Sequence, residues 1–181
     1  QQDKPDRYED AQKRVKKLLN QSVEKRMISD VPLGVFLSGG LDSSIITAIA
    51  SQHTKHLNTF SIGFENEGFF DETHDAELIA NKYQTNHTSI RLDKNELYDG
   101  LLQVLDYIDE PFADSSALAM WLLSKHTKKH VSVTLGGDGA DEMFSGYNKH
   151  LAHQNALANN LRNASIKNLN GLWKQLPKSR H

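Results

Sequence analysis

The stretch Val31-Pro-Leu-Gly-Val-Phe-Leu-Ser-Gly-Gly-Leu-Asp-Ser-Ser44 decides the fold of this chain. Its apolar run, residues 33–37, predicts a short buried strand because apolar side chains fill both faces. The run breaks at Ser38-Gly39-Gly40, and residues 41–50 then resume as a helix. Two adjacent glycines let the backbone turn tightly and bring its N–H groups against a ligand with no Cβ in the way. The stretch therefore predicts a strand, a tight turn and a helix, with room for a ligand at the turn.

The same turn has the features of a phosphate site. The helix that follows points its positive end at the turn, and a glycine-rich turn before a helix N-terminus suits a phosphate. Ser38, Ser43 and Ser44 add hydroxyl groups. Asp42 places a carboxylate beside the expected anion, which indicates a divalent cation between the two. The alternative is a plain strand-to-helix connection, since the loop has neither the Gly-Lys-Ser/Thr ending nor the Gly-x-Gly-x-x-Gly spacing of the best-known phosphate loops.

Strand-like and helix-like segments alternate along the rest of the chain. Further strands are expected over 58–64, 87–92 and 131–135, and helices over 7–28, from 71, from 93 and over 115–126. Right-handed crossovers between such segments predict an α/β fold, a parallel twisted sheet with helices on both faces. The expected organisation is a lead-in helix (1–28), a core (29–147) and a helical extension (148–181).

Two positional predictions accompany this fold. Gly63, near the end of the second strand, is expected to allow the close approach of a ligand base or ribose. In the helix that starts after Asp93, the apolar side chains are expected to point inward; they are Leu97, Leu101, Leu102, Leu105 and Ile108.

A second glycine-rich segment, Gly136-Gly-Asp-Gly-Ala-Asp-Glu142, follows the last expected strand. Ligands of parallel sheets bind at the carboxyl ends of the strands, so both glycine-rich loops are expected at one edge. A carboxylate beside a phosphate is unfavourable because both are negative, unless Mg²⁺ lies between them. This suggests that Asp42 and Asp141 share a magnesium ion with phosphate oxygens. The alternative is a helix N-terminus that simply carries acids.

Composition limits the function further. With 181 residues and a formal net charge of −2, the chain can bury a sizeable core but has no electrostatic footprint for nucleic acid. No apolar run approaches the length of a membrane span, so no membrane partner is expected, and a cytoplasmic enzyme fits. The chain has no cysteine, which excludes disulfides and a cysteine nucleophile within it.

Four motifs in one order resemble a known family. They are Ser-Asp-Val-Pro-x-Gly-x-x-Leu-Ser-Gly-Gly-Leu-Asp-Ser-Ser (29–44), Phe-Ser-Ile-Gly-Phe (60–64), Asp-Glu-Pro-x-Ala-Asp-Ser-Ser (109–116) and Gly-Asp-Gly-Ala-Asp-Glu-x-Phe-x-Gly-Tyr (137–147). The first resembles the loop of the N-type ATP pyrophosphatases, and together they resemble the synthetase domain of glutamine-dependent asparagine synthetases, type B. The resemblance implies a Rossmann-like PP-loop fold, ATP and Mg²⁺. It also implies that ATP adenylates the side-chain carboxylate of aspartate, releasing pyrophosphate, before ammonia displaces AMP to give asparagine.

The resemblance also implies roles for individual residues. It implies that Phe36 and Ile62 contact the adenine of ATP, and that Gly136 and Gly137 lie at the ribose and α-phosphate. The pyrophosphate loop and its neighbours bind the rest of the nucleotide; they are Leu37, Ser38, Gly39, Gly40, Leu41, Asp42 and Ser43. Asp42 and Asp141 match magnesium contacts, and Asp138 matches an acidic residue that handles protons as ammonia attacks. Asp114, Ser115 and Tyr147 match residues that line the site on the side of the aspartate substrate, called the aspartate side below. Three positions depart from the family pattern: Gly136 stands for Ser, Asp138 for Glu and Phe36 for Leu.

The resemblance further implies an N-terminal glutaminase domain that delivers ammonia from glutamine, and a homodimer is one option for the assembly. Because the chain has no cysteine nucleophile and stops soon after Tyr147, we expect an excised synthetase fragment with a truncated helical extension. Three rivals stay open: a sister ligase (a β-lactam or peptide cyclase, or a polysaccharide amidotransferase), a tRNA-modifying pyrophosphatase, and a non-catalytic nucleotide-binding module.

Overall fold

The structure is a computed structural model that describes residues 7–65, 71–110, 114 and 116–157. It divides into two compact units, residues 1–137 and 138–181. The first unit contains α1 (Tyr8–Arg26), β1 (Leu33–Phe36), α2 (Leu41–Ala50), β2 (Asn58–Phe64), α3 (Thr73–Tyr83), β3 (Asn86–Leu92), α4 (Lys94–Tyr107), α5 (Ser116–Thr127) and β4 (Val133–Leu135). The second contains α6 (Ala140–Phe144) and α7 (Asn148–Leu157). The second unit thus begins inside the predicted core of residues 29–147, and the predicted three-part division stays a prediction.

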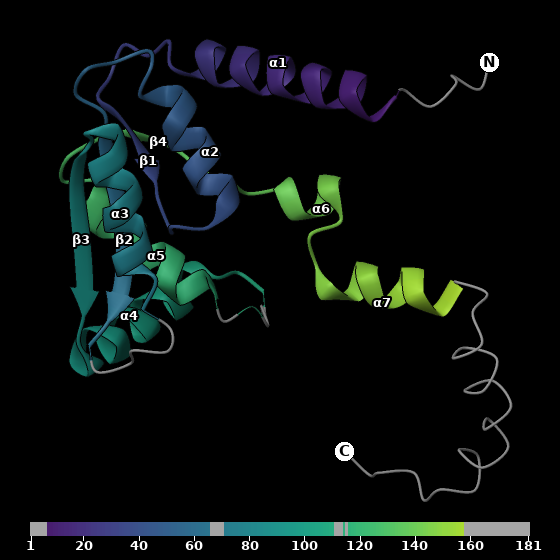
Figure 1. The fold of residues 1–181 in the computed structure, drawn as a ribbon. Helices are drawn as coiled ribbons and strands as arrows, with labels where there is room; N and C mark the ends of the chain where they lie inside the picture. The colour runs from purple at the N-terminus through teal and green to yellow at the C-terminus, as the bar shows by residue number, and fades with distance from the viewer. Residues whose placement is uncertain (1–6, 66–70, 111–113, 115, 158–181) are drawn as a thin grey trace, which may run out of the picture. The chain divides into compact units, whose positions relative to one another are not determined.

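Four parallel strands form one sheet in the order β3-β2-β1-β4 (Figure 1). The central strand β1 pairs with β2 through Phe36 opposite Phe60, and with β4 through Val35 opposite Leu135. Helix α2 links β1 to β2, α3 links β2 to β3, and both α4 and α5 lie between β3 and β4, so that helices cover the faces of the sheet as parallel pairing requires. The predicted parallel α/β fold with helices on both faces is confirmed.

The two faces of the sheet bury separate apolar clusters, because successive side chains of a strand point to opposite sides. Val35 and Leu37 point toward the side covered by α1, α2 and α3. Phe36 and Phe60 point toward α4 and α5, where Leu122 is fully buried. Full burial of a side chain of this size contributes about 1.5–3 kcal/mol, so these layers hold the carboxyl ends of the strands firmly in place.

Helix α4 begins as its sequence predicts, since the Asp93 carboxylate accepts a hydrogen bond from the Glu96 N–H at 2.8 Å. The inward orientation expected for its leucines is wrong for Leu101, Leu102 and Leu105, which are 42%, 50% and 59% exposed. The helix packs on α5 instead through Gly100, which lies against Leu122, and Val104 is its other buried residue. Its apolar surface is wider than the stripe that one neighbouring helix can cover.

Along the described segments, no helix combines the length and the apolar character that crossing a membrane requires.

Candidate functional site

The strand order places a candidate site between β1 and β4. From β1 the chain moves outward to β2 and β3, and it then returns to β4 on the other side of β1. Strand order therefore reverses at the β1–β4 pair, and in such sheets ligands bind outside the carboxyl ends of the strands at this reversal. The two glycine-rich segments follow β1 and β4 respectively.

The loop after β1 is shaped by its own serines. The Gly40 N–H donates to the Ser38 hydroxyl at 3.2 Å, and the Ser38 N–H donates to the Ser43 hydroxyl at 3.2 Å. The Ser43 hydroxyl in turn donates to the Gly40 carbonyl at 3.2 Å and lies 3.0 Å from the Ser38 hydroxyl. These bonds bend residues 38–43 into a compact turn at the end of the strand.

The N-terminus of α2 opens onto this turn. Gly40 precedes the helix with φ −64° and ψ 163°, and within the described residues no side chain caps the first N–H groups. Uncapped N–H groups and the positive end of a helix attract an anion. Asp42 lies half-buried in the first turn of the same helix, so its carboxylate shares this end with any bound anion.

Gly39 seats the loop on the next helix. Its φ is +83°, and a Cβ here would lie 2.6 Å from the Asp75 Cβ and 2.8 Å from the Ala76 N, in the first turn of α3. Only glycine combines this left-handed conformation with so close a contact. The loop is thus held between α2 and α3.

Gly137 brings the second glycine-rich segment against the first. A Cβ at residue 137 would lie 2.9 Å from the Asp42 Cβ and 3.0 Å from the Ser43 N. The chain after β4 therefore rests directly on the first turn of α2, and Gly136 lies exposed beside it. The loops that follow β1 and β4 meet at the point where strand order reverses.

A cavity of about 80 Å³ lies beside the loop. It is lined by Leu37, Ser38, Phe60, Ser61, Ile62, Glu72 and Leu123. Three predicted ATP-binding residues thus share one cavity: Leu37, Ser38 and Ile62. Two others lie elsewhere, since Phe36 packs into the core under α4 and α5 and the Leu41 side chain is 75% exposed.

The main chain of Ile62 faces the end of β1. The Phe60 carbonyl accepts a hydrogen bond from the Leu37 N–H at 2.8 Å. In a parallel pair, every second residue presents its N–H and C=O groups to the same neighbouring strand, so Ile62 faces the side of β1 as well. Because β1 ends at Phe36 and the chain then turns into the loop, the Ile62 main chain extends past the strand at the cavity.

The close approach predicted at Gly63 exists, but the chain itself makes it. A Cβ at Gly63 would lie 2.7 Å from Asp71 Oδ1 and 2.7 Å from Thr73 Cγ2, so these side chains lie against the glycine on its Cβ side. A ligand contact at Gly63 stays a prediction. The glycine lets the segment before α3 pack against β2.

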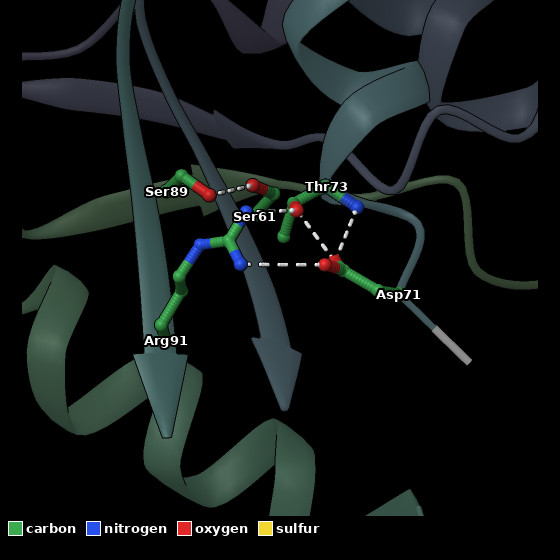
Figure 2. A network of polar contacts seen from close by, with 5 residues as sticks. All are labelled: Ser61, Asp71, Thr73, Ser89 and Arg91. Carbon is green, nitrogen blue, oxygen red and sulfur yellow. Dashed lines mark hydrogen bonds and ion pairs between the residues drawn. The ribbon is translucent and has the colours of Figure 1, made fainter. Parts of the chain in front are cut away.

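Figure 2 shows the polar network at this point, between β2, β3 and the start of α3. The Thr73 N–H donates to Asp71 Oδ1 at 3.0 Å, the Thr73 hydroxyl donates to the same oxygen, and Arg91 Nη1 lies 3.5 Å from Asp71 Oδ2. Hydrogen bonds from Thr73, together with the charge of Arg91, hold the pKa of Asp71 below its usual value. Deeper in the sheet, the Ser61 hydroxyl donates to Ser89 at 3.4 Å.

The predicted residues of the second unit form a local group of their own. The Tyr147 hydroxyl donates to Glu142 Oε1 at 2.5 Å, and this hydrogen bond lowers the pKa of Glu142. Asp141 lies against Gly146, whose N–H donates to the Asp141 carbonyl at 3.0 Å. Asp138, the first residue of this unit, is exposed. The joint placement of these residues with the loop after β1 stays a prediction.

The aspartate-side residues are only partly described. Asp114 is exposed, and its carboxylate accepts hydrogen bonds from the Ser116 N–H at 2.9 Å and the Ser116 hydroxyl at 2.7 Å. These two bonds lower the pKa of Asp114. Ser115 lies outside the described residues.

Sequence reasoning missed two polar residues of the cavity, Ser61 and Glu72. Ser61 lies within a predicted strand and Glu72 lies at the start of a predicted helix, so neither pattern marks them as ligand contacts. The signal that finds Glu72 is its position in the connection between β2 and α3, which follows the carboxyl end of a strand, where ligands of parallel sheets bind.

A parallel sheet with strand order 3-2-1-4, and with glycine-rich loops that meet at its reversal point, defines a doubly wound α/β protein of the nucleotide-binding type. Within that class the chain belongs to the asparagine synthase family, because the family model described as asparagine synthase matches residues 14–181. The predicted family is confirmed.

Two relatives show how far the similarity extends. The chain is 41% identical over 136 residues to asparagine synthetase [glutamine-hydrolyzing] 1 of Bacillus subtilis. This match covers 75% of this chain and 21% of the relative. It is 42% identical over 139 residues to putative asparagine synthetase [glutamine-hydrolyzing] 2 of Methanocaldococcus jannaschii. This match covers 75% of this chain and 26% of the relative. The chain therefore spans only about a fifth of the length of the first relative and about a quarter of the second.

Among solved structures, the NMN synthetase of Francisella tularensis resembles this chain with a TM-score of 0.50 at 19% identity. The match covers 73% of this chain and 58% of that one. At this identity the likeness concerns the fold alone.

Proposed function

We propose that the chain binds ATP at the junction of β1 and β4, with the triphosphate on the loop after β1 and the base in the cavity beside Ile62. The observation that carries this proposal is the contact of Gly137 with Asp42 and Ser43. It joins two glycine-rich loops over an uncapped helix N-terminus, an arrangement that gives phosphate oxygens free N–H groups without steric hindrance.

The side chains of the loop have separate tasks in this proposal. The residues Ser38, Gly39, Gly40 and Ser43 surround the pyrophosphate, and the Leu41 and Asp42 N–H groups at the start of α2 face it. Leu37 and Ile62 contact the base, with Phe36 behind them, and Gly136 and Gly137 leave room for the ribose and α-phosphate. Asp42 and Asp141 would hold Mg²⁺ together with phosphate oxygens. Carboxylates and phosphates are the ligands this ion prefers, and it would neutralise the charge of the leaving pyrophosphate.

The reaction that we assign to this site is the synthesis of asparagine. The side-chain carboxylate of aspartate attacks the α-phosphorus of ATP, an O–P bond forms, and pyrophosphate leaves. Ammonia then attacks the acyl carbon, loses a proton with the help of Asp138, and displaces AMP. Asp114, Ser115 and Tyr147 bind the aspartate. Family membership and the names of the relatives support this ligase over a cyclase or another sister enzyme.

Both relatives named above are described as glutamine-hydrolyzing. We therefore also propose that the ammonia comes from glutamine through a glutaminase domain outside this chain, and that the enzyme works in the cytoplasm.

The test measures the release of pyrophosphate from ATP in the presence of Mg²⁺, with and without aspartate. Ammonia is added directly, so that no glutaminase domain is needed. We expect release only when aspartate is present, formation of asparagine and AMP in equal amounts, and loss of both with Asp42→Asn. Ser51→Ala is the matched control, because the Ser51 hydroxyl donates to the Ala48 carbonyl at 3.0 Å, at the end of α2 that lies away from the loop. Pyrophosphate release that does not depend on aspartate would refute the assigned substrate.

A further inference from the structure

Among the described residues that line the cavity, Glu72 is the one whose polar side chain has no hydrogen-bond partner in the protein. The other polar side chains that line it are already engaged: Ser38 with Ser43 and Gly40, and Ser61 with Ser89 and with His87 Nε2 at 3.1 Å. Within the described residues, no hydrogen bond or ion pair involves the Glu72 carboxylate. Glu72 is exposed and lines the cavity, so its carboxylate has open acceptor positions within reach of a ligand there.

The surroundings of Glu72 suit a flat base better than a sugar. Phe60, Ile62 and Leu123 supply apolar side chains to the same cavity. The main chain of Ile62, which extends past the end of β1, adds one donor and one acceptor in the plane of the sheet. An apolar slot with a few placed polar groups is the usual setting for a purine ring.

The backbone around Glu72 is held in place on both sides. Asp71 and Thr73, its two chain neighbours, bond to each other, and Arg91 of β3 contacts both, with Nη2 3.3 Å from the Thr73 hydroxyl (Figure 2). The Glu72 carbonyl also accepts a hydrogen bond from the Ala76 N–H at 3.1 Å. Because these bonds hold the backbone, Glu72 loses less conformational entropy when a ligand binds in the cavity.

We propose that Glu72 selects the base of the nucleotide, by accepting a hydrogen bond from the exocyclic 6-amino group of adenine. A 6-oxo purine presents an acceptor at the same position, so the carboxylate and the oxo group repel each other. The inference rests on the proposed binding of ATP and adds to it a residue that determines specificity. Discrimination of this kind is strong because the wrong base leaves an acceptor without a donor.

The test compares the dissociation constants of ATP and inosine triphosphate, with Mg²⁺, for the full 181-residue chain by isothermal titration calorimetry. We expect wild type to prefer ATP, and Glu72→Gln to lower that preference by roughly tenfold, since an amide both accepts and donates hydrogen bonds. Glu77→Gln is the matched control, because Glu77 is an exposed glutamate of the same helix outside the cavity lining.

A second comparison uses purine riboside triphosphate, which lacks the 6-amino group. Wild type is expected to bind it more weakly than ATP, and Glu72→Ala is expected to show a smaller difference between the two. If both Glu72 variants keep the wild-type ratios, the role of Glu72 is overturned while ATP binding stands. If wild type binds neither ATP nor inosine triphosphate, the proposed nucleotide site fails, and the role of Glu72 fails with it.

Discussion

Substitution of Gly137 by alanine tests the junction of the two glycine-rich loops. The added Cβ would lie 2.9 Å from the Asp42 Cβ, half an ångström short of the 3.4 Å at which ordinary contacts begin. It would also lie 3.0 Å from the Ser43 N and 3.2 Å from the Asp42 C. All three atoms belong to the backbone or to a Cβ, so no side-chain rotation relieves the contact and the two loops must separate.

The size of the effect follows from this contact. Overpacking of a close junction costs about 1–3 kcal/mol. For a chain of this length, 1 kcal/mol corresponds to a fall in Tm of about 2–4 °C. Separation of the loops also displaces the first turn of α2, so we expect ATP to bind at least about tenfold more weakly, which corresponds to 1.4 kcal/mol. Thermal unfolding followed by circular dichroism and a calorimetric titration with ATP measure the two effects.

Gly100→Ala is the control. A Cβ at Gly100 would lie just as close to a neighbour, 2.9 Å from Leu122 Cδ2, but that atom is the end of a flexible side chain in the core under α4 and α5. We expect this variant to bind ATP as wild type does. Gly137→Ala with wild-type Tm and wild-type ATP affinity would refute the inference that the loops touch at this residue.

Three further predictions concern the scaffold of the site. Gly39→Ala should lower the free energy of unfolding by at least about 2 kcal/mol, because it adds left-handed strain to a clash with Ala76 N; urea denaturation measures this, and a smaller loss contradicts the loop geometry. Burial lowers the pKa of His87, so its contribution to stability is complete above the unfolded value of about 6.5 and is lost as pH falls through the folded pKa. Urea unfolding at pH 7.5 and pH 5.5 should show this loss, and His87→Gln should lessen it; an equal loss in that variant would point to other groups. Asp93→Ala removes the acceptor of the Glu96 N–H and should cost about 1 kcal/mol, whereas Asp93→Ser should retain most of the stability in the same thermal melt.

Local signals in the sequence were sufficient for the elements that form the site. The apolar run before Ser38, the paired glycines and the helix-forming segment after them predict β1, the loop and α2, and the structure confirms these elements with small changes at their ends. These features succeed because strand, turn and helix preferences depend on residues a few positions apart. The inward orientation predicted for the leucines of α4 is wrong for three of them, because helical periodicity does not reveal how wide a surface the neighbouring helix covers.

Gly63 shows a different limit of sequence reasoning. A glycine near a strand end signals that something approaches closely, but the sequence does not reveal what. Here Asp71 and Thr73, from the segment that leads into α3, make a close approach on the Cβ side of the glycine. The identity of the approaching group depends on how a distant part of the chain folds back.

The sequence by itself determined the class of fold, the family and the two glycine-rich loops, because each is written in residues that are close together along the chain. Only the tertiary structure decided that β4 returns to the side of β1, that Gly137 rests on the first turn of α2, and that Glu72 shares a cavity with Ile62. These facts join residues that are far apart in sequence, and their proximity comes from strand pairing and from the packing of helices on the sheet. The sequence pattern thus predicts the segments that form the site, and the topology of the sheet brings those segments together.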